Sequence, residues 1–323
     1  MAAMALPPFV HLHLHSEFSL VDGLLRIKPL VAAAAKSDMP AIAVTDQVNL
    51  FALVRFYKAA QAAGIKPLVG VDLWIHEDDA QLGPSRLVLL CQNLVGYRNL
   101  TRLVSRAYTE GQGGGVPALR REWLRGHTEG LLALSAGMHG DVGRALLAGK
   151  TSEAQRLLAD WLALFPDRYY LELIRTKREK EEDYLHLAVE LALAQDVPVV
   201  ASNDVRFLSR HDFEAHEARV CIHDNRVLAD PRRPRRYSEE QYLKSPQEMA
   251  ALFADLPEAL ANTVEIAKRC NLELSLGKAF LPDFPVPDGL TMDDYFRGLA
   301  QQGLEVRLAR LLDATAPDYL ARR

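Results

Sequence analysis

Short non-polar runs alternate along this chain with longer segments of helical periodicity, six or seven times within about 200 residues. The run at residues 41–44 is non-polar at every position, which is typical of a parallel strand buried on both faces. This order predicts an α/β fold, with parallel strands joined by helical crossovers in a barrel or an open sheet. The expected strands cover residues 9–15, 41–44, 66–75, 87–91, 131–135, 169–174 and 198–201, and the expected helices cover 27–38, 49–63, 95–108, 140–148, 152–164 and 179–194.

The first expected strand carries a row of histidines. Phe9, His11, His13 and His15 alternate with non-polar residues, so they point to one face of the strand. His13 and His15 can therefore reach one common point, and two neutral imidazoles suit zinc, iron or manganese. Asp22 follows in a loop and could add an oxygen ligand. The alternative is that these are solvated polar residues on an exposed strand face.

Polar residues also follow the other expected strands where these end. In barrels and open α/β sheets the chemistry lies at the carboxyl ends of the strands. Asp46 and Gln47 end the second expected strand, Asp72 lies in the third, Gly137 comes just after the fifth, and Asp204 and Arg206 follow the last. Their repeated placement at strand ends predicts a shared pocket.

Composition limits the classes of protein to consider. The chain has 323 residues, enough for one large α/β domain with an appendage or for two domains. Its net charge of −4 argues against a surface that is basic throughout, as in proteins that wrap nucleic acid. Cys91, Cys221 and Cys270 form no CxxC pair, which predicts free thiols in a reducing compartment. No signal peptide or membrane span is expected, and the predicted location is cytoplasmic.

The pattern changes after Arg206. We expect a helix at about 212–222, where His216 and Glu217 resemble part of a zinc-protease motif. Val220 stands where that motif needs its second histidine, so these side chains are expected to be surface or satisfied residues. A basic loop follows at 231–236. It is either a solvated charge run or a contact with DNA or a partner, through Arg232, Arg233, Arg235 and Arg236.

The C-terminal part reads as helical. Ser245 begins a helix with a capping box, and a further helix is expected at 257–269. Residues 281–287 look like an extended linker, and Thr291 caps a last helix that runs to about 312. Too little chain follows that helix to build a domain, so we expect the sequence to be a fragment of a longer protein.

These stretches together resemble the polymerase-and-histidinol-phosphatase (PHP) domain, in the form found at the N-terminus of bacterial DNA polymerase III alpha subunits. The resemblance covers nearly the whole chain, in order. It rests on HLHLHS and LVDG at 11–16 and 20–23, AVTD at 43–46, GIKPLVG at 64–70, YLELIR at 170–175, ASNDVRF at 201–207, LPEALANT at 256–263 and LP at 281–282.

Metal-bearing members of that family place nine ligands around the pocket. The resemblance implies that five positions keep a residue able to ligate, with Asp72 replacing the usual Glu: His13, His15, Asp22, Asp72 and Asp204. Four positions have lost their ligand: Gln47, Arg86 and Arg206 each replace a His, and Gly137 replaces a Cys.

The two arginines are informative replacements. An arginine stays protonated and has no lone pair for a metal. Arg86 and Arg206 would instead bring positive charge to Asp22, Asp72 and Asp204, whose mutual repulsion would otherwise be costly in a buried pocket. We therefore expect a degenerate, proteobacterial-type site in which protein charge replaces the metals.

The resemblance also implies an architecture. It implies a distorted (β/α)7 barrel over about 7–210, then a small helical extension over about 211–280, which together make up a PHP domain at 1–280. Residues 281–323 would be a linker and the first helix of the polymerase (palm) region.

Partners and cofactors follow from the same resemblance. In this form the domain supports the polymerase and binds the separate proofreading exonuclease subunit. The implied partners are that subunit, the rest of the alpha subunit, and DNA through the parent protein, with no membrane. The fragment would require no cofactor, although the remaining ligands leave room for one weakly bound divalent metal. Mg²⁺ would serve the parent polymerase, whose paired carboxylates lie beyond Arg323.

Two functions of different classes follow from these observations. The first is a binding and scaffolding module without its own chemistry. The second is a metal-dependent phosphoesterase or 3′–5′ exonuclease, in which a metal-bound hydroxide attacks phosphorus. The ligand set separates them, because a multi-metal hydrolase needs ligands that the four replaced positions do not supply.

Overall fold

The computed structural model of the chain describes residues 9–76, 83–112, 115–279, 281, 284–310 and 316–322. Parts of three expectations lie outside these residues: the start of the chain at 1–8, the linker residues 282–283, and the last helix beyond 310. The chain divides into two compact units, Met1–Leu274 and Ser275–Arg323. The site lies in the first.

The order of helices and strands follows the expected alternation. The strands are β1 (Ala41–Val44), β2 (Lys66–His76), β3 (Ser85–Cys91), β4 (Ala118–Arg120), β5 (Leu131–Leu134), β6 (Tyr169–Ile174) and β7 (Val199–Ser202). The helices of the first unit are α1 (Ile27–Lys36), α2 (Leu53–Ala62), α3 (Leu94–Glu110), α4 (Asp141–Leu147), α5 (Thr151–Leu164), α6 (Glu181–Gln195), α7 (Phe213–His223), α8 (Pro246–Leu252) and α9 (Pro257–Arg269).

The strands form one curled sheet in the order β1-β2-β3-β5-β6-β7, with β4 paired to β2 off this path. Residues 9–16 lie between the two ends of this sheet. The Thr45 amide donates to the Leu14 carbonyl at 2.9 Å on the β1 side, and Leu14 bridges Val205 just after β7. The extended segment thus takes the place of the seventh strand in the expected distorted barrel.

The observed sheet differs from the expected barrel in three details. Residues 9–15 are extended but form isolated bridges instead of a regular strand, because their neighbours pair with only a few of their backbone groups. β3 runs antiparallel to both β2 and β5. The link between β2 and β3 is too short for the helical crossover that a parallel pair needs. β4 was not expected, since only three residues pair.

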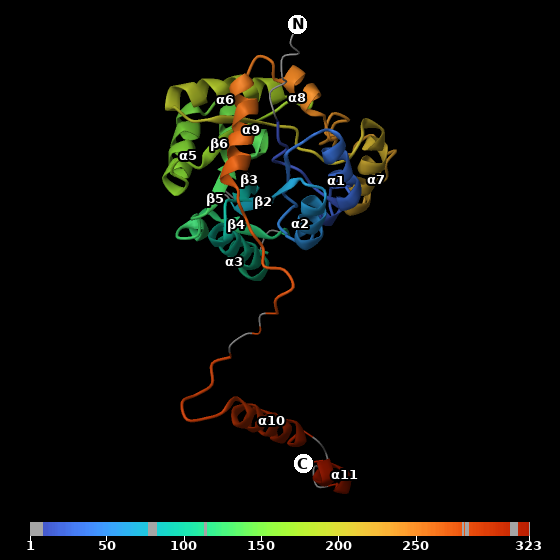
Figure 1. Cartoon of the computed structure of the whole chain (residues 1–323), viewed down its shortest axis with the longest axis vertical. Helices are drawn as coiled ribbons and strands as arrows, with labels where there is room; N and C mark the ends of the chain where they lie inside the picture. The colour runs from blue at the N-terminus through green and yellow to red at the C-terminus, as the bar shows by residue number, and fades with distance from the viewer. Residues whose placement is uncertain are drawn as a thin grey trace. The chain divides into compact units, whose positions relative to one another are not determined.

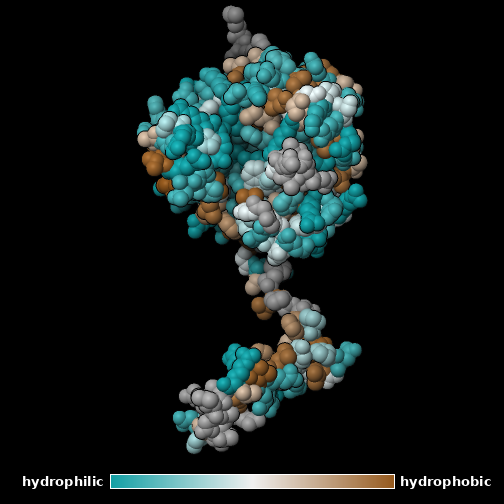
Figure 2. Space-filling model, turned by 180° about the vertical axis from the view of Figure 1, so that it is seen from behind, coloured by the Kyte–Doolittle hydropathy of each residue, from teal (hydrophilic) through white to brown (hydrophobic). Residues whose placement is uncertain are grey.

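Helices pack around the sheet, with α5 and α6 on one side and α1, α2 and α7 on the other (Figure 1). The sheet itself is almost wholly buried: each residue of β1, β5 and β6 is inaccessible to solvent or nearly so. The surface in Figure 2 is mostly hydrophilic, with hydrophobic residues in small separate areas. Among the described residues, no helix is both long and non-polar enough to cross a bilayer.

Local signals set several helix ends. Ser245 caps α8 with the expected capping box, in which its side chain and that of Glu248 each bond the other's backbone amide. α2 begins four residues later than expected because residues 45–52 form a loop in which Val48 has φ 48°. In the second unit, Thr291 caps α10 (Met292–Leu308), and α11 (Pro317–Arg322) follows.

Candidate functional site

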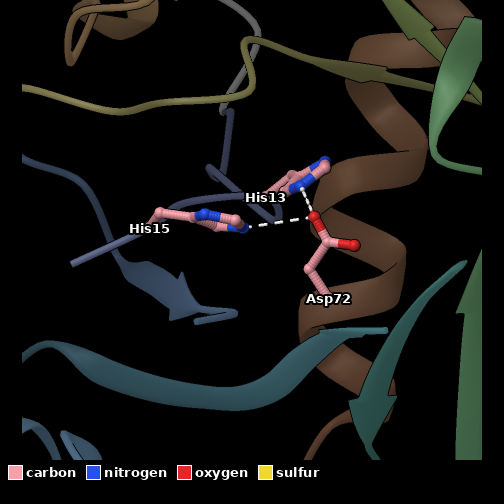
Figure 3. Close-up of side chains that lie close together, drawn as sticks. All are labelled: His13, His15 and Asp72. Atoms are coloured by element: carbon pink, nitrogen blue, oxygen red, sulfur yellow. Dashed lines mark hydrogen bonds and ion pairs between the residues drawn. The ribbon is translucent and has the colours of Figure 1, made fainter. Parts of the chain in front are cut away.

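His13 and His15 meet Asp72 at the centre of the buried site, as Figure 3 shows. The Nε2 atoms of both histidines face one oxygen of Asp72, Oδ2, at 2.9 and 3.1 Å. The Nδ1 atoms face two other carboxylates, Glu172 at 2.9 Å and Asp22 at 2.7 Å. One ligand atom from each of His13, His15 and Asp72 lies within 4.8 Å of the others, so these three form a candidate metal-binding group.

The fold determines why these side chains converge. His13 and His15 lie on the extended segment held by Val205: the His15 amide donates to the Val205 carbonyl at 2.9 Å, and the Val205 amide donates to His13 at 3.1 Å. Asp72 lies in the middle of β2, where Gln47 bridges it. The histidine row of the sequence therefore does face a site, and its exposed-strand alternative is wrong for His13 and His15, which are 3% and 0% exposed.

Arg86 closes one side of this group. It lies on β3 opposite Trp74 and two ladder positions from the residue opposite Asp72. Its Nε donates to Asp72 Oδ1 at 3.1 Å, and its Nη2 donates to Oδ2, the oxygen that both histidines face. The Trp74 ring lies 4.9 Å from the guanidinium carbon and supports it from one face. Arg86 thus forms a bidentate pair with the central carboxylate.

Arg206 closes the other side and is itself 1% exposed. Its Nη1 lies 3.0 Å from Asp22 Oδ2, as an ion pair without hydrogen-bond alignment, and its Nη2 donates to Asp204 Oδ1. A second guanidinium, that of Arg178, lies 3.2 Å from Asp204 Oδ2 and also donates to Glu181 at 2.6 Å. Three arginines therefore surround the buried carboxylates.

The arginines set the ionisation of the carboxylates. Burial alone would raise the pKa of each acid. Arg206 nevertheless holds the pKa of Asp22 and of Asp204 well below the usual range, and Arg86 does the same for the pKa of Asp72. The acids are thus ionised at neutral pH, held in that state by charged side chains of the protein itself.

His13 is also charged in this arrangement. Burial would lower its pKa, but Glu172, Asp204 and Asp72 raise the pKa to about 10. Both ring nitrogens face carboxylate oxygens, so both must donate. An imidazolium has no free lone pair, and it could ligate a metal only after losing a proton.

The remaining replaced positions add no ligand. Gln47 is partly buried next to Asp72, and its backbone N–H donates to Ser19 Oγ at 3.1 Å. Gly137 has φ 59°, and a Cβ placed there would lie 3.0 Å from Ile174 Cδ1. A cysteine at this position would therefore be strained in this backbone, whatever its chemistry.

The donor atoms of this site can be compared with what a multi-metal cluster requires. His13, His15 and Asp72 have the spacing for one ion. The oxygen that would be shared is already held by Arg86, and His13 carries a proton at each nitrogen in this geometry. The residues present do not fit a multi-metal cluster.

Several residues of the site were not singled out from the sequence. Glu172 is a charged residue inside an otherwise non-polar strand, which is a signal that could have been used. Arg178, Tyr237 and Gln241 come from loops and gave no such signal: Tyr237 donates to Asp22 Oδ2 at 3.1 Å, and Gln241 Nε2 donates to Asp204 Oδ2 at 2.9 Å. His216 is buried and satisfied through Nε2, 2.9 Å from a backbone carbonyl, as one of the two expectations had it.

The basic loop is largely paired within the chain. Arg233 donates to Glu217, Arg236 donates to Asp224, and Arg232 bonds Asp230 at 3.2 Å. Arg235, which is exposed, lines a neighbouring cavity. The idea that this loop contacts DNA or a partner stays a prediction, but three of its guanidiniums already have carboxylate partners.

A family model and several named proteins match this chain. A family model for the PHP domain matches residues 11–176. A protein of Pseudomonas aeruginosa named DNA polymerase III subunit alpha is 57% identical over 317 residues, which cover 98% of this chain and 27% of that protein. The protein of the same name from Escherichia coli K12 is 53% identical over 308 residues, which cover 95% of this chain and 26% of that protein. The chain thus spans about a quarter of the length of these relatives.

Among solved structures, an amidohydrolase from Chromobacterium violaceum with bound sulfate and no metal is similar to this chain. The TM-score is 0.43 and the identity 17%, with 61% of this chain and 87% of that chain covered.

Proposed function

Since this chain belongs to the PHP domain family, we propose that it is the PHP module of a bacterial replicative DNA polymerase alpha subunit and has no hydrolytic activity of its own. The relatives named above support the placement in that subunit. One observation carries the second half of the proposal. The carboxylates that would hold metals are paired with Arg86 and Arg206 inside the protein.

The chemistry of those arginine–carboxylate pairs explains why hydrolytic activity would be absent. A phosphoesterase of this kind needs ions that activate water and hold the attacking and leaving oxygens together. Guanidinium groups neutralise the carboxylates but cannot ligate or lower the pKa of a bound water. The remnant His13, His15 and Asp72 would accept at most one weakly held divalent ion, with Arg86 competing for the carboxylate.

The role that remains is scaffolding. The PHP domain, at about residues 1–280, would support the rest of the alpha subunit and bind the proofreading exonuclease subunit in the cytoplasm. Residues 281–323 would lead into the polymerase region, where Mg²⁺ and DNA act. The fragment therefore would not polymerise nucleotides alone.

The second candidate is a metal-dependent phosphoesterase or 3′–5′ exonuclease. The close approach of His13, His15 and Asp72 favours it, because this is the one group of the described residues with metal-ligand spacing. We favour the scaffolding role over this candidate. The Asp72 oxygen that a metal would share already accepts from Arg86, and both His13 ring nitrogens already face carboxylates.

A hydrolysis assay separates the two candidates. The purified chain is incubated with bis(p-nitrophenyl) phosphate and with 3′-labelled single-stranded DNA, in the presence of Mn²⁺, Mg²⁺ or Zn²⁺. A His13→Ala variant prepared in parallel is the matched control, since a contaminating nuclease would act equally in both. We expect equal background rates. Robust hydrolysis that His13→Ala abolishes would establish the phosphoesterase instead.

A further inference from the structure

The segment that joins α7 to α8 lies across the carboxylate cluster. We call residues 225–244, which follow Asp224 at the C-terminal end of α7, the strap; Figure 1 shows the two helices that it connects. Two of its side chains reach the cluster: Tyr237 donates to Asp22 at 3.1 Å, and Gln241 donates to Asp204 at 2.9 Å. Asp22 and Asp204 are also the two carboxylates that pair with Arg206. The strap thus adds neutral donors where the cluster would otherwise be open.

Backbone hydrogen bonds hold the end of the strap near the site. The Arg206 amide donates to the Gln241 carbonyl at 2.8 Å, and the Leu243 amide donates to the Phe207 carbonyl at 3.0 Å. Ser238 Oγ donates to the Thr176 carbonyl beyond β6. The strap therefore bridges the ends of β6 and β7, across the mouth of the barrel.

Arginines of the basic loop at 231–236 hold the other end of the strap through ion pairs. Arg233 pairs with Glu217 of α7, and these side chains are 13% and 6% exposed. Arg233 Nε also donates to the Leu228 carbonyl at 3.0 Å, which fixes the turn of the strap. Arg236 pairs with Asp224 at the end of α7. Arg233 thus points back toward α7 and is largely buried, whereas Arg236 makes its pair with Asp224 at the surface, with 52% of its side chain exposed.

A cavity of about 360 Å³ lies on the outer side of this arrangement. The residues that line it include Arg233 and Glu217, which form the ion pair described above, and Tyr237, whose hydroxyl donates to Asp22. Tyr237 therefore lies between this cavity and the buried carboxylates. An ion that entered from the cavity would have to displace it.

We propose that the strap is a lid held shut by a two-arginine clasp, Arg233–Glu217 and Arg236–Asp224, and that it shields the carboxylate cluster from solvent and its cations. The inference rests on the proposed function, because a working metal site would have to admit its ions and substrate. It gives the basic run a role within the chain: these arginines position Tyr237 and Gln241. They are positioning residues and do not contact a substrate.

Hydrogen exchange of the whole chain, measured by mass spectrometry, tests the lid. The clasp variant Arg233→Ala/Arg236→Ala should raise amide exchange in residues 225–244 by about tenfold, because it removes two charge-assisted hydrogen bonds. The control variant, Arg232→Ala/Arg235→Ala, removes the same charge from the same run but leaves the clasp intact. It should change exchange there by less than about twofold.

Two further measurements keep the test decisive. Glu217→Gln/Asp224→Asn breaks the same two pairs from the helix side and should open the strap to a similar extent. Raising the salt concentration should speed strap exchange in the unmodified chain but not in the clasp variant, because salt screens the pairs. Equal exchange in clasp and control variants, or an increase that spreads equally through β6 and β7, would overturn the lid. Metal-dependent hydrolysis by the unmodified chain would overturn the proposed function, so the two ideas fail by different results.

Discussion

Replacing Arg206 by alanine should destabilise the first unit far more than removing an exposed arginine. Arg206 is 1% exposed and pairs with Asp22 and Asp204, whose side chains are 1% and 3% exposed. Removing one partner of a buried pair leaves an uncompensated buried charge and typically costs about 3–5 kcal/mol. Arg178 still reaches Asp204, so Asp22 would bear most of the loss.

The matched control is Arg156→Ala on α5. Arg156 is 63% exposed and pairs with Asp160 four residues along the helix. Pairs of this kind contribute about 0.3–0.5 kcal/mol. Arg206→Lys is a second variant, which keeps the positive charge but loses the planar guanidinium. Its loss of unfolding free energy should fall between those of Arg206→Ala and Arg156→Ala.

Urea unfolding followed by tryptophan fluorescence measures the difference. All three tryptophans, Trp74, Trp123 and Trp161, lie in the first unit, so the signal reports on the barrel alone. The free energy of unfolding should fall by about 3–5 kcal/mol for Arg206→Ala. Equal stability of Arg206→Ala and Arg156→Ala would refute the reasoning, because it would mean that Asp22 and Asp204 do not depend on this cation.

The remaining predictions concern pH and the lost ligands. The raised pKa of His13 stabilises the fold fully below its unfolded pKa of about 6.5, and this contribution disappears as the pH rises through about 10. Urea unfolding at pH 7 and pH 10 should therefore show a smaller pH dependence for His13→Gln than for the unmodified chain; an identical dependence would contradict the charged His13. Restoring histidines with Gln47→His, Arg86→His and Arg206→His should raise Mn²⁺ occupancy in equilibrium dialysis, and unchanged occupancy would mean that the arginines do not exclude the ion. Adding Gly137→Cys should lower the melting temperature of that variant, because the left-handed backbone costs about 1–2 kcal/mol with a side chain; an unchanged melting temperature would contradict the strain.

The parts of the fold that depend on local pattern could be predicted from the sequence. A wholly non-polar run gave β1, and a largely non-polar run gave β6, both with their observed bounds. A capping signal gave the start of α8, and helical periodicity gave α9. The direction of β3 could not be read in this way. A strand that is buried on both faces has the same composition whether its neighbours are parallel or antiparallel, so pairing direction depends on the connection and on tertiary packing.

The site shows the same division. Alternation placed His13 and His15 on one face, and the end of the last strand placed Asp204 near them, because the geometry of strands is regular. Asp72 lies within β2 and not at its end. The conformation of Gly137 could not be predicted. The sequence shows a glycine where the family has a cysteine, but it does not show that the backbone there has a left-handed φ. Long-range partners from loops, such as Tyr237 and Gln241, were also not predictable, since no periodicity constrains where a loop side chain points.

We propose that arginines, not metals, supply the positive charge that holds the carboxylate cluster together. Thermal unfolding of the purified chain with and without a strong chelator tests it most directly, because a metal that binds only the folded state would stabilise it. We predict melting temperatures that agree within about 1 °C, less than the shift expected from 1 kcal/mol of stability. A large fall in the melting temperature on chelation, reversed by adding back Mn²⁺ or Zn²⁺, would contradict the claim.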